Sequence, residues 1–276
     1  MAAGGADMSA LASGTGFDGV GKFLSTSSNW WGPDGLVHYV RDHVIYSAII
    51  VFVAALIALP LGLLVGHTGR GVVFVAGLAN GLRAVPTFGM LVLVYVWLSP
   101  KIPVNRHDVL FLPRGAVSAF IPVVLVLILL AIPPILTNTY AGIQAVDPAT
   151  RDAARGMGMR GSQVLRLVEL PNALPLIMSG LRSATLQVIA TVTIAPFLPL
   201  LGGLGRPIAD GAAQNIEQGY PQMVGAAIVV AALALSADGV LNVVQRLVVS
   251  PGVSGRYRSQ PGVTTEPLVE AQLTVA

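Results

Sequence analysis

The sequence predicts an all-α polytopic membrane protein with about five transmembrane helices, on the strength of three observations. Hydrophobic residues make up 54% of the 276 residues and charged residues only 11%, against roughly 25% charge in an ordinary soluble domain. Several uncharged or nearly uncharged runs are long enough to cross about 30 Å of hydrocarbon as helices. One long charge-rich stretch, residues 147 to 171, lies between strongly apolar segments. We therefore expect one membrane domain, residues 44 to 250, with a polar segment outside the bilayer.

Composition also argues against several kinds of site. The chain has no cysteine, which excludes disulfides, thiolate metal sites and a cysteine nucleophile. The net charge of +3 comes mostly from arginines scattered among apolar runs, which indicates loop charge rather than a nucleic-acid surface. The four histidines lack metal-ligand spacing, and no group of side chains suggests an enzyme active site; they are His38, His43, His67 and His107.

Residues 1 to 43 are rich in Gly, Ala and Ser and lack the basic start and apolar core of a signal peptide. We expect a flexible extracytoplasmic leader, with Trp30 and Trp31 as an aromatic anchor at the membrane interface. Residues 16 to 22, GFDGVGK, nearly match a phosphate-binding P-loop. Phe23 replaces the Ser or Thr that would bind magnesium and no apolar strand precedes the run, so no nucleotide site is expected.

The first predicted span is residues 44 to 66, which carry no charge and include Gly62 and Gly66, small residues at a spacing that permits a close helix crossing. Residues 72 to 98 are longer than a span requires and contain Pro86 and Gly89. We interpret them as one bent or broken helix that crosses once, with two very short spans as the alternative.

Broken membrane helices are tolerated chiefly where the freed backbone groups face protein or a water-filled cavity. The break therefore makes Arg83, Pro86 and Thr87 candidates for a translocation path, with a purely structural kink as an equal alternative. A polar loop, residues 99 to 117, separates this segment from the third span, residues 118 to 138.

The fourth span is predicted at residues 174 to 195 and includes Arg182 and Gln187. Prolines and glycines then break the chain, and a loop or short re-entrant segment fits residues 206 to 222. The fifth span, residues 223 to 246, contains Asp238, and residues 251 to 276 have the Gly, Pro and Ser content of a mobile cytoplasmic tail.

Arg182 and Asp238 each lie about eight residues from the same end of their spans, roughly 12 Å deep at 1.5 Å per residue. Ionisable groups at such depth usually pair or face water. We therefore expect the two side chains to approach each other, either as a structural pair or as part of a translocation path.

The charge-rich stretch predicts two short helices around a glycine turn. Asp147 followed by Pro148 is a helix start, and glycines from position 156 onward favour a turn. Ser162 is the expected cap of a second helix that ends at Pro171. Such short helices need a partner surface, which could be another protein or, as an alternative, the membrane surface.

This stretch resembles the EAA loop of permease subunits of bacterial ABC importers: EAA, three residues, Gly, nine residues, then Ile, any residue, Leu, Pro. Asp and Val replace Glu and Ile conservatively and the spacing is kept; the matching residues are Asp152, Ala153, Ala154, Gly158, Val168, Leu170 and Pro171. The resemblance implies a type I ABC importer (MetI-like) permease fold in the bacterial cytoplasmic membrane. It makes the stretch a cytoplasmic loop that docks into a groove of a separate ATPase.

The resemblance also implies the partners of the chain. They are a dimer of ATPase subunits, a second permease subunit that is the same chain or a paralogue, and an extracytoplasmic substrate-binding protein. ATP and magnesium would bind the ATPase, and this chain would bind no cofactor. No nucleic acid is expected.

From about residue 44 to 252 the chain is similar to the branch that imports osmoprotectants such as glycine betaine, carnitine or choline. The segments GLRAVPTFGMLVLV and LPLIMSGLRSATLQVIATVTIA carry this likeness, whereas Leu198, Pro199 and Leu200 depart from it. The alternatives are a methionine-type or other amino-acid permease, a stand-alone channel or secondary transporter, and a membrane scaffold.

Overall fold

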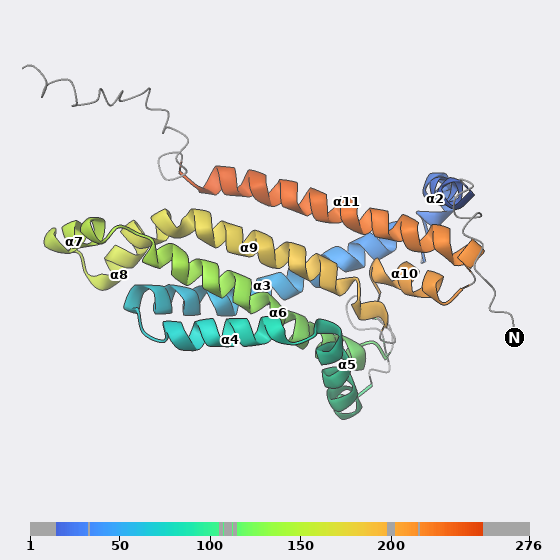
Figure 1. The fold of residues 1–276 in the computed structure, drawn as a ribbon, viewed down its shortest axis with the longest axis horizontal. Helices are drawn as coiled ribbons and strands as arrows, with labels where there is room; N and C mark the ends of the chain where they lie inside the picture. The colour runs from blue at the N-terminus through green and yellow to red at the C-terminus, as the bar shows by residue number, and fades with distance from the viewer. Residues whose placement is uncertain are drawn as a thin grey trace, which may run out of the picture.

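The computed structural model describes residues 15–32, 34–104, 107, 112, 115–197, 202–214 and 216–250. Four long helices in this part of the chain have the length and hydropathy of membrane spans. Their helical bounds are α3 (Leu36–Thr68), α6 (Val117–Gln144), α9 (Leu170–Val192) and α11 (Ile216–Val248). They run along the long axis of the molecule (Figure 1), with α7 and α8 at one end and α2 and α10 at the other. We call these the α7 end and the α2 end.

The predicted first span is part of a longer helix. α3 begins at Leu36 rather than at residue 44, and a helix α2 (Thr15–Ser25) precedes it, followed by the 3-10 turn Ser27–Asn29. Trp30 is half-buried and its Nε1 donates a hydrogen bond to the Leu24 carbonyl at 2.6 Å, whereas Trp31 is 70% exposed. Within the expected leader, therefore, Trp31 is exposed and Trp30 packs against protein.

The predicted break in the second apolar segment is present. α4 (Val72–Ala84) and α5 (Thr87–Leu98) meet at 88°, and together they count as a fifth candidate span by length and composition. The break follows from Pro86, which has no amide hydrogen and favours an extended residue before it; Val85 has φ −77° and ψ 129°. After the break α5 turns away from the bundle (Figure 1) and ends in a 3-10 turn, Ser99–Lys101.

Small residues bring α3, α6 and α9 into close contact. A Cβ built on Gly62 would lie 2.6 Å from the Thr139 Cβ, and one on Gly66 would lie 2.7 Å from the Ile143 Cβ. Real Cβ atoms do not approach so closely, so the predicted close crossing at these two glycines is confirmed. On the other side of α6, a Cβ on Gly180 would lie 2.7 Å from the Asn138 Cβ. These three helices therefore form a tightly packed block.

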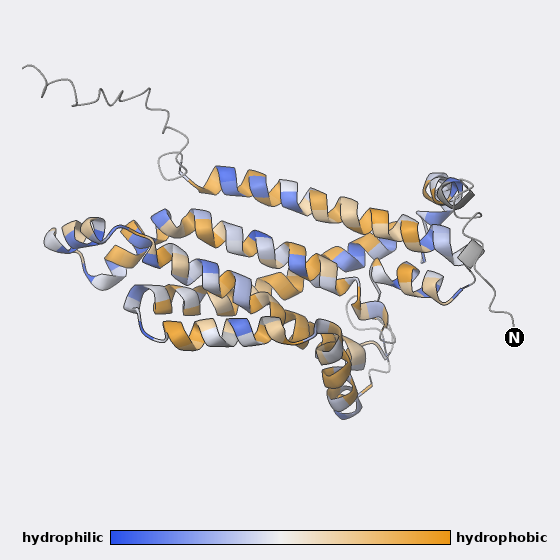
Figure 2. Cartoon of the chain, in the orientation of Figure 1, coloured by the Kyte–Doolittle hydropathy of each residue, from blue (hydrophilic) through white to orange (hydrophobic). Residues whose placement is uncertain are grey.

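The outer helices expose apolar side chains. Figure 2 shows hydrophobic residues predominating over α5 and the middle of α11, and only 11% of the α11 span window is buried, against 61% for α6. Exposed apolar faces of this extent suit contact with lipid or with another subunit. The region expected as a loop or re-entrant segment contains a short helix, α10 (Gly205–Ala212), after the 3-10 turn Ala195–Phe197. Residues 198 to 200 and the tail 251 to 276 lie outside the described residues.

Candidate functional site

The charge-rich stretch forms a helical hairpin at one end of the bundle (Figure 1). α7 (Pro148–Gly156) begins with the Asp147 side chain accepting a hydrogen bond from the Ala149 amide at 2.9 Å, as the sequence predicts. Gly158 then adopts φ +85°, a left-handed conformation that favours glycine, and no atom lies within 4 Å of the place where its Cβ would be. Glycine is needed here for backbone conformation rather than for space.

The second helix of the hairpin differs from the prediction in both its start and its end. α8 (Gly161–Val164) begins one residue before Ser162, and the Arg160 amide donates to the Gln163 side chain at 2.7 Å. The chain then continues through a π-turn, Leu165–Glu169, directly into α9. Pro171 does not end a helix, because the wider π-turn before it accommodates a residue that lacks an amide hydrogen.

The seven residues of the EAA-like pattern lie along this hairpin. Asp152 and Ala153 are exposed, and Asp152 pairs with Arg155 of the same helix at 3.3 Å; Ala154 is buried. The three residues after the glycine turn, Val168, Leu170 and Pro171, are half-buried at the π-turn and the start of α9. The hairpin thus presents an exposed helical face beyond the end of the spans.

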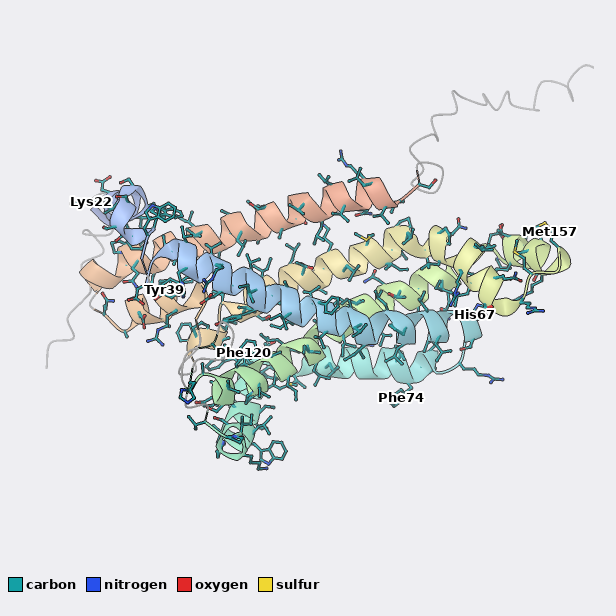
Figure 3. All side chains as sticks on the ribbon, turned by 180° about the vertical axis from the view of Figure 1, so that it is seen from behind. Lys22, Tyr39, His67, Phe74, Phe120 and Met157 are labelled. Carbon is teal, nitrogen blue, oxygen red and sulfur yellow. The ribbon has the colours of Figure 1, made fainter. Side chains whose placement is uncertain are left out.

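Two large apolar side chains add to this exposed face. Met157 is 73% exposed and Leu167 is 65% exposed, and Figure 3 shows Met157 at the tip of the hairpin. Large apolar side chains exposed at a helical hairpin beyond the spans are suited to contact with another protein.

A buried carboxylate at the base of the hairpin was not expected from the sequence. Glu169 is 1% exposed, and its two oxygens contact different partners: Oε1 lies 3.0 Å from Arg151 Nε of α7, and Oε2 lies 2.6 Å from His67 Nδ1 at the end of α3. A second guanidinium nitrogen of Arg151 donates to the carbonyl of Ile143 near the end of α6. We call Arg151, Glu169 and His67 the buried triad.

Helical periodicity places Glu169 on the polar side of the hairpin with Arg166, and this is why the triad was missed. The π-turn inserts an extra residue into the helical repeat, which rotates Glu169 inward while Arg166 stays exposed. A carboxylate within the otherwise apolar run LVELP was the one available signal.

The expected approach of Arg182 and Asp238 is confirmed as a contact. Arg182 of α9 binds Asp238 of α11 through both carboxylate oxygens, and both side chains are partly exposed. The Gln187 amide donates instead to the Leu130 carbonyl of α6 at 3.3 Å. These polar groups therefore link α9 to α11 and to α6.

An apolar cavity of about 410 Å³ is lined by Ala237, the residue before Asp238, and by Thr185, one turn after Arg182. It lies between α3, α9 and α11, and its lining includes Ser47, Thr185 and Ala237. The remaining candidates are elsewhere: Pro86 caps α5 and Thr87 is its first residue. Arg83 belongs to α4, and its side chain is outside the described part of the structure.

Two hydrogen bonds hold α3 in place at the α2 end. His43 is fully buried, with Nε2 3.0 Å from the Ile189 carbonyl of α9 and Nδ1 accepting from the Leu204 amide at 3.3 Å. Because a carbonyl oxygen only accepts, Nε2 carries the hydrogen. Within the described residues no group of three or more His, Asp or Glu side chains could hold a metal ion.

Comparison with known proteins places these features in a family. A family model described as "Binding-protein-dependent transport system inner membrane component" matches residues 58–250. The glycine betaine/carnitine/choline transport system permease protein OpuCB of Bacillus subtilis (strain 168) is 32% identical over 80% of this chain and 91% of the relative. The carnitine transport permease protein OpuCD of Listeria monocytogenes serotype 1/2a (strain 10403S) is 36% identical over 74% of this chain and 82% of the relative.

Solved structures show the same fold. The chain resembles the MetNI methionine ABC transporter in an inward-facing conformation, with TM-score 0.62 and 18% identity over 78% of this chain and 96% of the other. It also resembles an amino acid ABC transporter with histidines, with TM-score 0.55 and 21% identity over 76% and 93% of the two chains. At these identities the likeness establishes the fold alone.

Proposed function

The chain belongs to the family of binding-protein-dependent transport system inner membrane components, and from this premise we propose that it couples ATP hydrolysis on a separate subunit to import of an osmoprotectant. It is a multi-pass membrane permease subunit of an ABC transporter with an all-α, MetI-like fold. The coupling element would be the hairpin of residues 147 to 171, and the cargo would be glycine betaine, carnitine or choline.

The geometry of the hairpin supports the coupling role. α7 lies beyond the ends of the spans (Figure 1), its acidic and small residues Asp152 and Ala153 are exposed, and Met157 is exposed at the tip. A short capped helix in this position offers a surface that an ATPase groove could hold. This exposed face, combined with its EAA-like spacing, is the observation that carries the proposal.

The cargo assignment rests on the relatives. Relatives at 32% to 36% identity are transport permeases for glycine betaine, carnitine or choline. The solved structures with amino-acid cargo are 18% and 21% identical and favour no particular cargo. A quaternary ammonium cargo, selected by an extracytoplasmic binding protein, is therefore the better-supported class.

The translocation path would run along the faces that carry the polar groups within the spans. We assign to it Arg182, Gln187 and Asp238, and the broken segment of Arg83, Pro86 and Thr87. The lining of the cavity between α3, α9 and α11 includes Thr185 and Ala237, which are close in sequence to Arg182, Gln187 and Asp238. The working complex would contain two ATPase subunits, a second permease subunit and the binding protein, with ATP and magnesium on the ATPase.

The test is purification of the tagged chain in mild detergent from its native host, followed by mass spectrometry of the proteins that copurify. We expect an ATPase subunit with the wild type and its loss with Gly158→Arg. At φ +85° any side chain strains the turn that sets the orientation of α7. Arginine also adds a bulky cation at the tip. An accompanying binding protein would then be assayed for choline, carnitine and glycine betaine.

The matched pair that isolates the backbone effect is Gly158→Ala and Gly156→Ala. Neither new Cβ would meet an atom within 4 Å, and of the two positions only Gly158 has a positive φ. We expect Gly158→Ala to weaken retention of the ATPase and Gly156→Ala to retain it. Purification of the wild type as a lone homo-oligomer, with ion flux in liposomes that lack ATP, would overturn the proposal in favour of a channel or secondary transporter.

A further inference from the structure

The buried triad lies where the hairpin joins the membrane block. Glu169 is in the π-turn between α8 and α9, with Arg151 of α7 on one oxygen and His67 of α3 on the other. Figure 3 shows His67 at the same end of the molecule as Met157, the tip of the hairpin. One carboxylate thus contacts side chains from two elements besides its own.

The same contacts reach the rest of the block. Arg151 also binds the carbonyl of Ile143, a fully buried residue near the end of α6. Ile143 is the residue whose side chain packs against Gly66 of α3, one residue before His67. The triad therefore joins α7 to the tightly packed α3, α6 and α9. These three helices pack so closely at their glycines that the block resists internal rearrangement.

Few other ion pairs connect the hairpin to this block. Of the ion pairs among the described residues, Arg151–Glu169 is the pair that connects α7 to another element, since Arg155–Asp152 is internal to α7. Glu169 is also nearly inaccessible to water, so its two contacts are not screened as surface ion pairs are. A movement imposed on α7 would reach the spans through this contact.

We propose that Glu169 is a positioning residue for coupling: it holds α7 at a fixed orientation to α3 and α9, so that movement of α7 becomes movement of the spans. This inference rests on the coupling role proposed above. Glu169 would act through Arg151 and His67 and would touch neither cargo nor ATPase.

The experiment uses the complete complex of this chain with its ATPase and binding protein in liposomes. Glu169→Gln keeps the shape of the side chain but removes its charge. We expect the complex to assemble and to hydrolyse ATP, while choline imported per ATP hydrolysed falls about tenfold, a typical size for a lost coupling free energy.

A distance measurement reports on the position of α7 directly. The chain has no cysteine, so spin labels can be attached at Leu64→Cys on α3 and Thr150→Cys on α7, both exposed positions. We expect a narrow distribution of label distances in the otherwise wild-type complex and a broader one with Glu169→Gln. A merely structural role would lower the yield of complex and leave both readouts unchanged.

Arg70→Gln is the matched control, because it removes one charge at an exposed position three residues after His67, just past the end of α3 and outside the hairpin of residues 147 to 171. It should keep the wild-type import per ATP and the narrow distribution. If Glu169→Gln does not accumulate, Glu169→Asp replaces it; the shorter side chain cannot keep both contacts, and an intermediate loss of import per ATP is expected.

The outcomes separate the two proposals. Wild-type import per ATP and a narrow distribution in the Glu169 variant overturn the positioning role and leave the proposed function standing. Failure of the wild-type chain to bind an ATPase overturns the proposed function. If the wild-type complex forms but imports no choline, the cargo assignment fails, and the label distances still decide the role of Glu169.

Discussion

At the α7 end of α3, His67 contacts a carboxylate that is shared with Arg151, whereas at the α2 end of the same helix His43 contacts two main-chain groups. Both histidines connect α3 to segments at or next to the ends of α9. His43 is fully buried and hydrogen-bonds to neutral main-chain groups. His67 belongs instead to a charged cluster at the base of the hairpin.

The difference concerns what happens when one partner is lost. When a neutral side chain is removed, its hydrogen bonds are lost and a carbonyl or an amide is left unsatisfied. A buried ionic tie leaves a charge without its counter-charge, which costs more. The charged end is therefore the more sensitive of the two, which fits a contact that must transmit movement.

The largest effect should come from Arg151→Met. This change leaves the Glu169 carboxylate buried without its guanidinium, and breaking such a pair typically costs about 3 kcal/mol of unfolding free energy. The measurement is denaturation of the purified subunit in detergent. Adding Glu169→Gln to the same chain should recover much of the loss, because no unpaired charge remains; a double variant less stable than Arg151→Met would contradict this account.

His43→Ala should have a smaller effect, about 2 kcal/mol, from two lost hydrogen bonds and a small cavity. His38→Ala is the matched control. His38 is only partly buried and contacts Asp42 at 3.3 Å, so its removal should cost about 0.5 kcal/mol. Equal losses for the two histidines would show that the neutral tie does not hold α3.

Apart from the His38→Ala control, the smallest effects should come from two glycines, one at each end. Gly158→Ala and Gly203→Ala both place a side chain at positive φ, +85° and +91°, which costs about 1 kcal/mol. At Gly203 the new Cβ would also lie 3.4 Å from His43 Nδ1, whereas at Gly158 it would meet nothing within 4 Å. Because 3.4 Å is an ordinary van der Waals contact, the two variants should lose similar stability, and a much larger loss at either position would show that the left-handed backbone is not the main cost.

Structural features could be predicted from the sequence where neighbouring residues cause them. The start of α7 follows from Asp147 and Pro148, and the break before α5 follows from Pro86. The contact of Arg182 with Asp238 was predictable from depth alone, because two charges at equal depth in neighbouring spans are expected to pair. The EAA-like spacing likewise depends on residues within one short segment.

The beginning of α3 and the role of His43 were not predictable in this way. Hydropathy assigned residues up to 43 to a leader because charged and polar side chains there end the apolar run. In the structure Asp42 and His43 are buried, and the partners of His43 come from chain segments that are near it only in space; the Ile189 carbonyl is 146 residues away.

By itself the sequence determined the membrane class, the number and order of the apolar segments and the capped, glycine-hinged hairpin between two of them. Each of these depends on hydropathy summed over a segment or on the conformational preference of a single residue. Only the tertiary structure decided that Glu169 turns inward to Arg151 and His67. A π-turn changes the helical repeat by one residue, and whether it forms depends on buried partners that the linear pattern does not contain.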